Sequence, residues 1–249
     1  VYANVSRGYK AGAFPTSAFL LEIAAAPVVQ ETVLAYEAGF KTFWLDRSLQ
    51  INGAYFHYDY RNKQVNGTVP EPVVFGTLFG LLNVPKSVVD GFEISSLWSP
   101  VDGLSLRADA TYLLTKVTTD FLNIDPLGNA VNYKGSRFPY TPKWSIATGA
   151  SYEWSLSSDV IAYVGVDYSY RSSTKSSFLD LDYERIKGYG LLDLRAGIRL
   201  ADSRWSAELW GRNVTNTYYW NDGTYVTDTS YRRTGMPVTY GLRLNYRFR

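Results

Sequence analysis

Strict alternation of apolar and polar residues is the feature that most restricts how this chain can fold. In the segment Val238–Phe248, all six even-numbered positions are apolar or aromatic, and none of the five odd-numbered positions is. In a chain with 46% hydrophobic residues, such a pattern arises by chance on the order of one time in a thousand. Because side chains of a β-strand alternate between two faces, the segment predicts a strand with one apolar and one polar face.

The same alternation recurs along the chain and predicts about ten strands. The clearest are 34–44, 92–98, 104–114, 144–154, 160–170, 192–200, 205–209 and 238–248, with a partial strand at 1–9. The segment 48–61 is less regular, and we place Phe56, Tyr58 and Tyr60 on its apolar face. Many of these strands are about 10 to 14 residues long, whereas strands of soluble proteins usually have about 5 or 6. A tilted strand that crosses a bilayer needs roughly 9 to 11 residues.

The connections between the predicted strands alternate between short and long. Short ones lie at 46–47, 100–103, 156–159 and 202–203, and long ones lie at about 10–31, 61–85, 117–141, 172–189 and 215–236. Aromatic residues make up 16% of the chain and gather near the strand ends, as in the two interfacial girdles of a membrane barrel. We therefore predict an all-β fold, an antiparallel transmembrane β-barrel, over a soluble β-sandwich or a β-solenoid.

Composition and charge exclude several functional classes. The net charge of +2 argues against a protein that binds nucleic acid by neutralising phosphates. The chain has no cysteine and one histidine, so disulfide scaffolds, thiolate zinc sites and cysteine nucleophiles are excluded. No run of 18 apolar residues is present, as a transmembrane helix would require. We expect no cofactor, because no phosphate-binding glycine loop or nucleophile elbow occurs.

Two groups of side chains could carry chemistry, and neither forms a complete site. His57 and Asp59 fall on the same face of a strand, but no further acidic pair or nucleophile accompanies them, so a lumen or rim histidine is favoured over catalysis. Asp180, Asp182 and Glu184 alternate within a long connection, without the glycine and spacing of a calcium-binding loop. We expect neither an enzyme nor a metal site.

Several stretches together resemble a TonB-dependent outer-membrane receptor, specifically the C-terminal part of its barrel. They are Val1–Phe14, Glu31–Lys41, Leu49–Tyr60, Asp90–Glu93, Pro100–Leu104, Asn213–Asn216 followed by Tyr218 and Tyr219, and Tyr240–Phe248. Each motif is weak alone, but their order and spacing cover essentially the whole chain. Tyr246 and Phe248 resemble the signal read by the barrel assembly machinery, although Arg249 follows the final aromatic residue.

The resemblance implies that residues 1–249 are the C-terminal segment of a 22-stranded barrel. In this family an N-terminal plug fills the barrel and contacts the TonB energy-coupling complex, and we find no plug in these residues. The implied location is the outer membrane of a Gram-negative bacterium, in contact with outer-membrane lipids. The implied function is the active import of a bulky nutrient, most readily a ferric siderophore. A carbohydrate, a plant-derived aromatic compound, a cobalamin or a self-contained ten-stranded protease or adhesin are the alternatives.

Candidate site residues follow from the two faces and the long connections. Charges on the polar face can pair across strands, line a water-filled pore or contact the plug, and we favour the plug because the family barrel is filled. These candidates are Glu37, Lys41, Arg107, Asp109, Arg195, Arg199 and Arg243. The long connections are rich in aromatic and basic residues, Arg137 among them, which suit an anionic or aromatic ligand. As ligand candidates we single out Tyr183, Arg185, Lys187, Trp220, Tyr231, Arg232 and Arg233.

Overall fold

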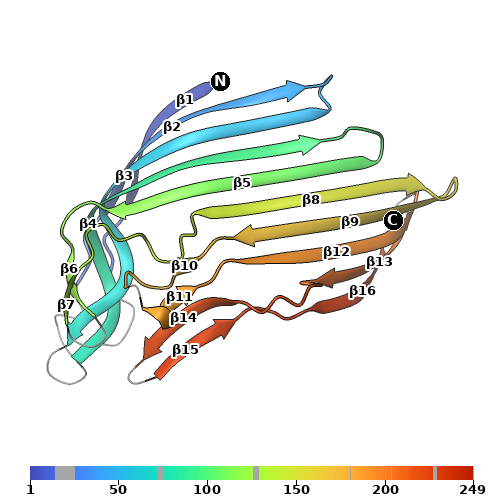
Figure 1. Cartoon of the computed structure of the whole chain (residues 1–249). Coiled ribbons are helices and arrows are strands. Elements are labelled where there is room, and N and C mark those ends of the chain that lie inside the picture. Colours follow the sequence, from blue (N-terminus) through green and yellow to red (C-terminus); the bar gives the residue numbers. More distant parts are fainter. Residues whose placement is uncertain are drawn as a thin grey trace.

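Ten antiparallel strands form one sheet (Figure 1). The computed structural model describes residues 1–14, 26–71, 76–125, 129–179, 181–202, 204–226 and 229–248, so Asp180 and Arg249 lie outside the described residues. In spatial order the sheet contains β1 (Tyr2–Lys10), β2 (Glu31–Trp44), β3 (Leu49–Glu71), β4 (Gly76–Trp98), β5 (Leu104–Val117), β8 (Trp144–Ser155), β9 (Val160–Arg171), β12 (Tyr189–Leu200), β13 (Trp205–Arg212) and β16 (Thr239–Tyr246). The predicted strand number and all-β class are confirmed.

The strand register gives the sheet one apolar and one polar face. Residues directly opposite each other in neighbouring strands share a face, and Leu209 lies opposite both Leu242 and Ala196. We call this side, with its row of Leu, Val, Ala and aromatic residues, the apolar face, and the other side the polar face. Leu242 and Leu244 remain 61% and 65% exposed, as expected for a surface that contacts lipid. Within the described residues, no helix is long and apolar enough to cross a membrane.

Strand β3 corrects one part of the sequence analysis. Phe56 lies opposite Glu37 and Gly91, which puts Phe56, Tyr58 and Tyr60 on the polar face instead of the apolar face. His57 lies opposite Tyr36 and is therefore on the apolar face, so of the two predicted positions, lumen or rim, the lumen is wrong and the rim stays a prediction. Aromatic side chains occupy both faces of this strand, so that alternation alone does not distinguish them.

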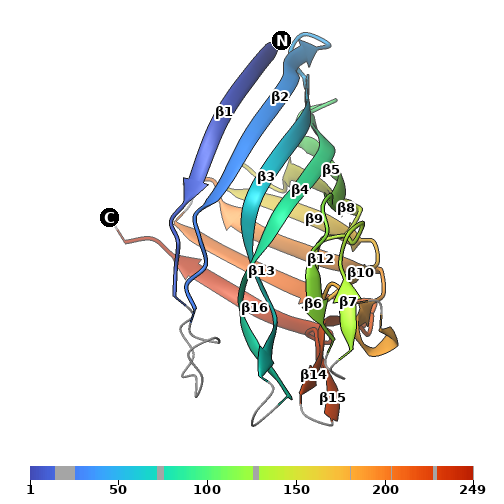
Figure 2. The same cartoon turned by 90° about the vertical axis from the view of Figure 1, so that its left-hand side faces the viewer.

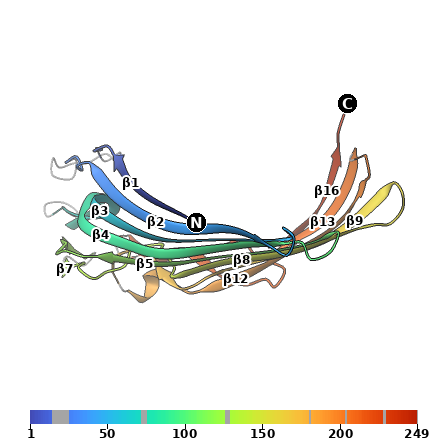
Figure 3. The ribbon, with the colours of Figure 1, turned by 90° about the horizontal axis from the view of Figure 1, so that it is seen from above.

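The sheet is curved but not closed. Figure 3 shows it as an arc with β1 and β16 towards its two ends, and Figure 2 shows the same sheet from the side. In the described part of the chain, β1 pairs only with β2, and β16 only with β13. Both edge strands therefore present unpaired backbone groups, which lipid does not satisfy.

Short turns lie at one end of the sheet and long connections at the other (Figure 1). The connection predicted at 61–85 is largely wrong, because pairing between β3 and β4 resumes after Asn62 and continues to Glu71 and Gly76. In the described residues, three of the other long connections contain small paired strands, and one of these three also contains a 3₁₀ helix. These elements are β6 (Leu122–Ile124), β7 (Ala130–Asn132), β10 (Thr174–Lys175), η1 (Asp182–Glu184), β11 (Arg185–Ile186), β14 (Trp220–Val226) and β15 (Thr229–Thr234).

Aromatic side chains form two groups on the apolar face. Towards the long-connection end, the rings of Phe92 and Tyr112 both pack against Trp144, at centroid distances of 5.7 and 4.7 Å. At the short-turn end, the ring centroid of Tyr246 lies 4.5 Å from that of Trp205 and 4.7 Å from that of Phe248. These groups match the two girdles of a membrane barrel, and the predicted assembly signal belongs to the second group.

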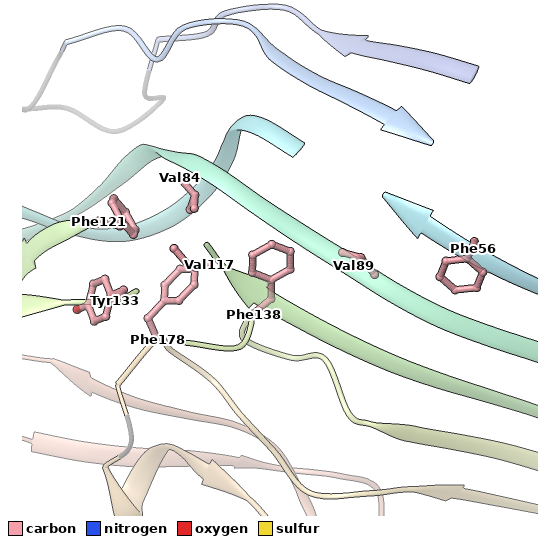
Figure 4. Close-up of a cluster of buried hydrophobic side chains, with 8 residues drawn as sticks. All are labelled: Phe56, Val84, Val89, Val117, Phe121, Tyr133, Phe138 and Phe178. Carbon is pink, nitrogen blue, oxygen red and sulfur yellow. The ribbon is translucent and has the colours of Figure 1, made fainter. Parts of the chain in front are cut away.

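A hydrophobic cluster joins the polar face to the long connections (Figure 4). Phe56, Val89 and Val117 come from β3, β4 and β5, and Val117 is fully buried. The connections contribute Phe121, Tyr133, Phe138 and Phe178, and the rings of Tyr133 and Phe178 stack at 5.3 Å between centroids. The connections thus pack onto this part of the polar face.

Glycines on the polar face lie beneath long side chains of neighbouring strands. A Cβ atom added to Gly165 would be 2.6 Å from the guanidinium carbon of Arg195, and one added to Gly197 would be 2.5 Å from the hydroxyl of Tyr163. One added to Gly241 would be 2.6 Å from the indole ring of Trp210. The absence of a side chain therefore lets charged and aromatic groups lie flat along the sheet.

Candidate functional site

The charged residues of the polar face pair with one another across strands. Arg107 lies 3.5 Å from Asp109 and 3.3 Å from Asp167. Arg195 also donates a hydrogen bond to Asp167, so one carboxylate on β9 holds an arginine on each side. These side chains are about one-third to one-half exposed, so their ion pairs are accessible to water.

The other predicted polar-face candidates have partners as well. Arg199 donates to Glu153 at 2.7 Å, and Arg243 donates to Glu208 at 2.9 Å. Glu37 accepts a hydrogen bond from the hydroxyl of Tyr2 at 2.8 Å, and the ammonium of Lys41 lies 6.0 Å from the centre of that tyrosine ring. All seven candidates lie on the polar face, and their contact with a plug stays a prediction.

Trp220 brings together three of the predicted ligand residues. The guanidinium of Arg232 lies 4.5 Å from the centre of the Trp220 rings, and the ammonium of Lys187 lies 5.9 Å from it. Both distances are within cation–π range. The indole N–H of Trp220 also donates to the carbonyl of Arg185 at 3.1 Å. These contacts tie the β14–β15 hairpin to the connection that contains β11.

Of the remaining candidates, Arg233 and Tyr183 lie close to neighbouring residues, and Tyr231 faces solvent. Arg233 lies 3.8 Å from Asp222, which accepts a hydrogen bond from Tyr140 at 2.6 Å. Tyr231 is exposed, while the backbone carbonyl of Tyr183 lies close to Gly223. The seven candidates therefore lie around one hairpin, but their contacts mainly join connections to each other.

A cavity of about 490 Å³ lies beside Trp220, Lys187 and Tyr219. Its wall includes Tyr168 and Leu192, which belong to the apolar face. A ligand that enters the interior of a barrel would meet the polar face, so this cavity is poorly placed for such a ligand.

A second cavity, of about 340 Å³, lies between the connections that follow β5 and β9 and is lined by three cations. Arg137, Lys175 and Arg185 contribute to its wall, together with Gly135, Ser136, Phe138, Ser173 and Thr174. Phe138 belongs to the cluster on the polar face, and its backbone N–H donates to the polar-face residue Thr115 at 2.9 Å. We call this cavity the basic cavity.

The geometry of the basic cavity suits an anionic group. Arg137 donates to the carbonyl of Thr141 at 3.0 Å, but its Nε atom is buried and has no hydrogen-bond partner among the described residues. Lys175 donates to the carbonyl of Phe178 at 2.8 Å. An ammonium and two guanidinium groups can together hold carboxylate, phosphate or catecholate oxygens by charge-assisted hydrogen bonds.

The buried carboxyl group of Glu184 lies in the same connection as Lys175 and Arg185. Glu184 accepts a hydrogen bond from the hydroxyl of Ser177 at 2.5 Å. Burial raises the pKa of Glu184 above its ordinary value, although Ser177 and Lys175 act in the opposite direction. Burial likewise raises the pKa of Tyr133 to about 12, so this tyrosine stays neutral at physiological pH. The described residues contain no group of three or more potential metal ligands.

Sequence reasoning found only part of the basic cavity. Arg185 is one of the predicted ligand residues, Arg137 was noted only among the basic residues of the connections, and Lys175 was not considered. The three cations lie in different segments of the chain, up to 48 positions apart between Arg137 and Arg185. No local motif links them, and their segments are brought together by the packing of Phe138 against Phe178, the backbone hydrogen bond from Tyr140 to Lys175 and the pairing of Lys175 with Arg185.

Comparison with known proteins shows which family has this architecture. Residues 1–214 match the family model described as "TonB dependent receptor-like, beta-barrel". The ferric yersiniabactin uptake receptor FyuA from Yersinia pestis aligns over 99% of this chain and 34% of its own, with a TM-score of 0.78 and 17% identity. The siderophore receptor PiuA from Acinetobacter baumannii aligns over 88% of this chain and 29% of its own, with a TM-score of 0.66 and 21% identity.

A third solved structure gives the same result. The ferric-catecholate import receptor Fiu from Escherichia coli K12 aligns over 99% of this chain and 33% of its own, with a TM-score of 0.64 and 20% identity. The chain therefore spans about a third of the length of these proteins. Given the match over residues 1–214 and the ten-stranded sheet with one apolar face, the chain belongs to the TonB-dependent receptor family, as part of its β-barrel.

Proposed function

We propose that this chain is a barrel segment of a receptor in the bacterial outer membrane that imports a bulky ligand in a TonB-dependent way. A ferric siderophore is the ligand class that we favour. The observation that carries this choice is the basic cavity, where Arg137, Lys175 and Arg185 lie on the side of the polar face. The names of FyuA, PiuA and Fiu, which refer to iron chelates or siderophores, add support.

The chemistry of the basic cavity favours an anionic chelate over the other ligands. Ferric chelates built on carboxylate or catecholate oxygens carry negative charge, which three nearby cations stabilise. A neutral carbohydrate or a cobalamin would draw mainly on aromatic and amide contacts and less on the positive charge of these three residues. A self-contained ten-stranded protease or adhesin is less compatible with the unpaired edges of β1 and β16.

Further partners follow from membership in the family and stay proposals. Energy coupling would act through a plug domain, and charged residues of the polar face would contact that plug. Tyr246 and Phe248 would be read by the barrel assembly machinery, and the apolar face would contact outer-membrane lipids. We propose no catalytic role for any residue of the chain.

Equilibrium binding to the full receptor tests the ligand class. The double variant Arg137→Gln/Lys175→Gln should bind an anionic ferric chelate roughly ten- to a hundredfold more weakly than wild type, because charge-assisted hydrogen bonds are lost. Binding of a neutral chelate of similar size should change little. The matched control is Arg232→Gln/Arg233→Gln, which removes two cations outside the basic cavity.

Two results would contradict the proposal. An equal loss of the anionic and neutral chelates would show that Arg137 and Lys175 maintain the fold of the connections instead of contacting ligand charge. A larger effect of the control variant would move the anion site to the β14–β15 hairpin. Arg137→Gln alone keeps the hydrogen bond of Lys175 to Phe178 and serves as the test if the double variant does not assemble.

A further inference from the structure

Three cations interrupt the apolar face near the long-connection end of the sheet. Arg61 on β3 lies directly opposite Lys86 on β4. Lys116 on β5 lies opposite Val88, two residues along β4 from Lys86 on the same face. All three side chains are exposed. We call Arg61, Lys86 and Lys116 the cationic patch.

The cationic patch lies just beyond an aromatic girdle. On β4, the apolar face carries Phe92, then Asp90, Val88 and Lys86 in the direction of the long connections, and on β5 Tyr112 is followed by Leu114 and Lys116. Aromatic girdles mark the boundary between the hydrocarbon and the head groups of a bilayer. The patch therefore lies at the level of the lipid head groups, on the surface that contacts lipid.

The arrangement of Arg61 and Lys86 is unfavourable without an anion. Like charges directly opposite each other in a sheet repel, and neither residue has an ion-pair partner within the described part of the chain. The pair occurs where the hairpin bends, because Asn62 follows with a positive φ of 52° and Pro85 precedes Lys86. The backbone therefore holds two cations side by side at this boundary.

The nearest carboxylates on the same face interact with a histidine and a tyrosine. Asp90 accepts one hydrogen bond from the hydroxyl of Tyr55 at 3.0 Å and pairs with His57 at 2.7 Å. Asp59, between His57 and Arg61 on the same face, lies 3.7 Å from His57. These two carboxylates neutralise part of the local charge. Because the patch has three cations and a histidine beside it, its net charge remains positive.

We propose that the cationic patch binds the phosphate groups of a lipid head group in the outer leaflet. The inference rests on the outer-membrane location in the proposed function, and it concerns a surface separate from the basic cavity. Basic residues next to a hydrophobic span attract anionic head groups, and the apolar residues below the patch contact the acyl chains of the same lipid. A bis-phosphorylated head group supplies two anions to the three cations.

Lipid binding by the full receptor in detergent micelles tests this proposal. The probes are bis-phosphorylated lipid A and the same lipid with both phosphates removed. Each cation near a membrane surface contributes about a fivefold change in affinity, so Arg61→Gln/Lys86→Gln should weaken binding of the phosphorylated lipid by about 25-fold. Binding of the dephosphorylated lipid should not change.

The control variant is Arg47→Gln/Arg204→Gln, which removes two positive charges at the short-turn end and should leave lipid binding as in wild type. Lys116→Gln, on a separate strand, should cause about a fivefold loss and replaces the double variant if that variant does not assemble. Equal affinity of wild type and both patch variants for phosphorylated lipid would overturn the proposal. The proposal would also be overturned if inorganic phosphate, at the same concentration as the lipid, inhibited lipid binding, because the patch would then bind a free anion.

Binding of a ferric chelate, measured on the same preparations, separates this inference from the proposed function. Patch variants that lose the lipid but keep the chelate support the cationic patch as a lipid site. A receptor that binds no chelate yet distinguishes the two lipids overturns only the ligand class. Loss of both lipid discrimination and chelate binding in the patch variants would show a general effect on the fold and would overturn the inference.

Discussion

The two halves of the sheet use their polar faces in different ways. On β3, β4 and β5 this face carries Phe56, Val89 and Val117, and the long connections pack onto it (Figure 4). On β9, β12 and β16, and at Arg107 and Asp109 of β5, it carries ion pairs, such as the contact between Arg195 and Asp167. The first region is a small apolar core, and the second is a hydrated wall.

This difference shows that one face of a barrel can serve two purposes. Apolar burial excludes water and holds the connections in a fixed place, whereas partly exposed ion pairs contribute little to stability. The connections that form the basic cavity are therefore held by the apolar half. The ion pairs of the charged half stay accessible to water instead.

The largest expected effect is on the apolar half. Phe178→Ala removes a ring that packs against Phe121, Tyr133 and Phe138, and should lower the free energy of local unfolding by about 3 to 5 kcal/mol. Hydrogen exchange of the Tyr133 amide, which donates to Phe121 at 2.9 Å, measures the change. Tyr218→Ala, at an exposed aromatic position, is the control. Unchanged exchange in the first variant would mean that the connections are held by other contacts.

A somewhat smaller effect is expected in the strand that alternates most strictly. Leu244→Arg places a charge on the apolar face, and insertion should become less favourable by roughly 2 to 4 kcal/mol near the bilayer midplane. Asn245→Arg should be mild, because Asn245 lies on the polar face and donates to Ser206. Reversible unfolding from lipid vesicles compares the two. Similar losses for both variants would contradict the assignment of the faces in the charged half.

The smallest effect is expected from breaking the ion pairs. Asp167→Asn removes the carboxylate shared by Arg107 and Arg195, and should lower the free energy of unfolding by up to about 1 kcal/mol. The loss should shrink at high salt, since exposed charges are screened. Urea titrations at two salt concentrations test this, with Asp109→Asn as a weaker control. A salt-independent loss well above this size would give the charged half a structural role like that of the apolar half.

Alternation predicted the fold where only one face of a strand is apolar. In β5, β12 and β16 the polar positions carry Arg107, Arg195 and Arg243, so the faces could be assigned before the structure was known. In β3 the polar face is covered by connections and becomes apolar itself, and Phe56 was placed on the wrong side. Only the register with Glu37 on β2 resolves this strand.

The candidate site was harder to predict because it depends on packing between distant segments. The motif Asn213–Asn216 resembled the family, and the structure gives it a physical reason. The buried Asn213 side chain donates to the carbonyls of Thr217 and Met236 and accepts from the Thr217 amide, which joins both ends of the connection between β13 and β16. By contrast, Arg137 and Lys175 belong to no such motif, since no local rule predicts which connections will meet.

The glycines of the polar face also bear on movement inside a barrel. Because Gly165 and Gly197 lack side chains, Arg195 and Tyr163 lie along the sheet instead of projecting from it. These side chains therefore stay close to the sheet, and Asp167 and Glu208 pair with the neighbouring Arg195 and Arg243. Around Asp167, a body inside the barrel would meet cations that already have a carboxylate partner. Low relief and local charge balance would let such a body slide along this part of the wall with little resistance.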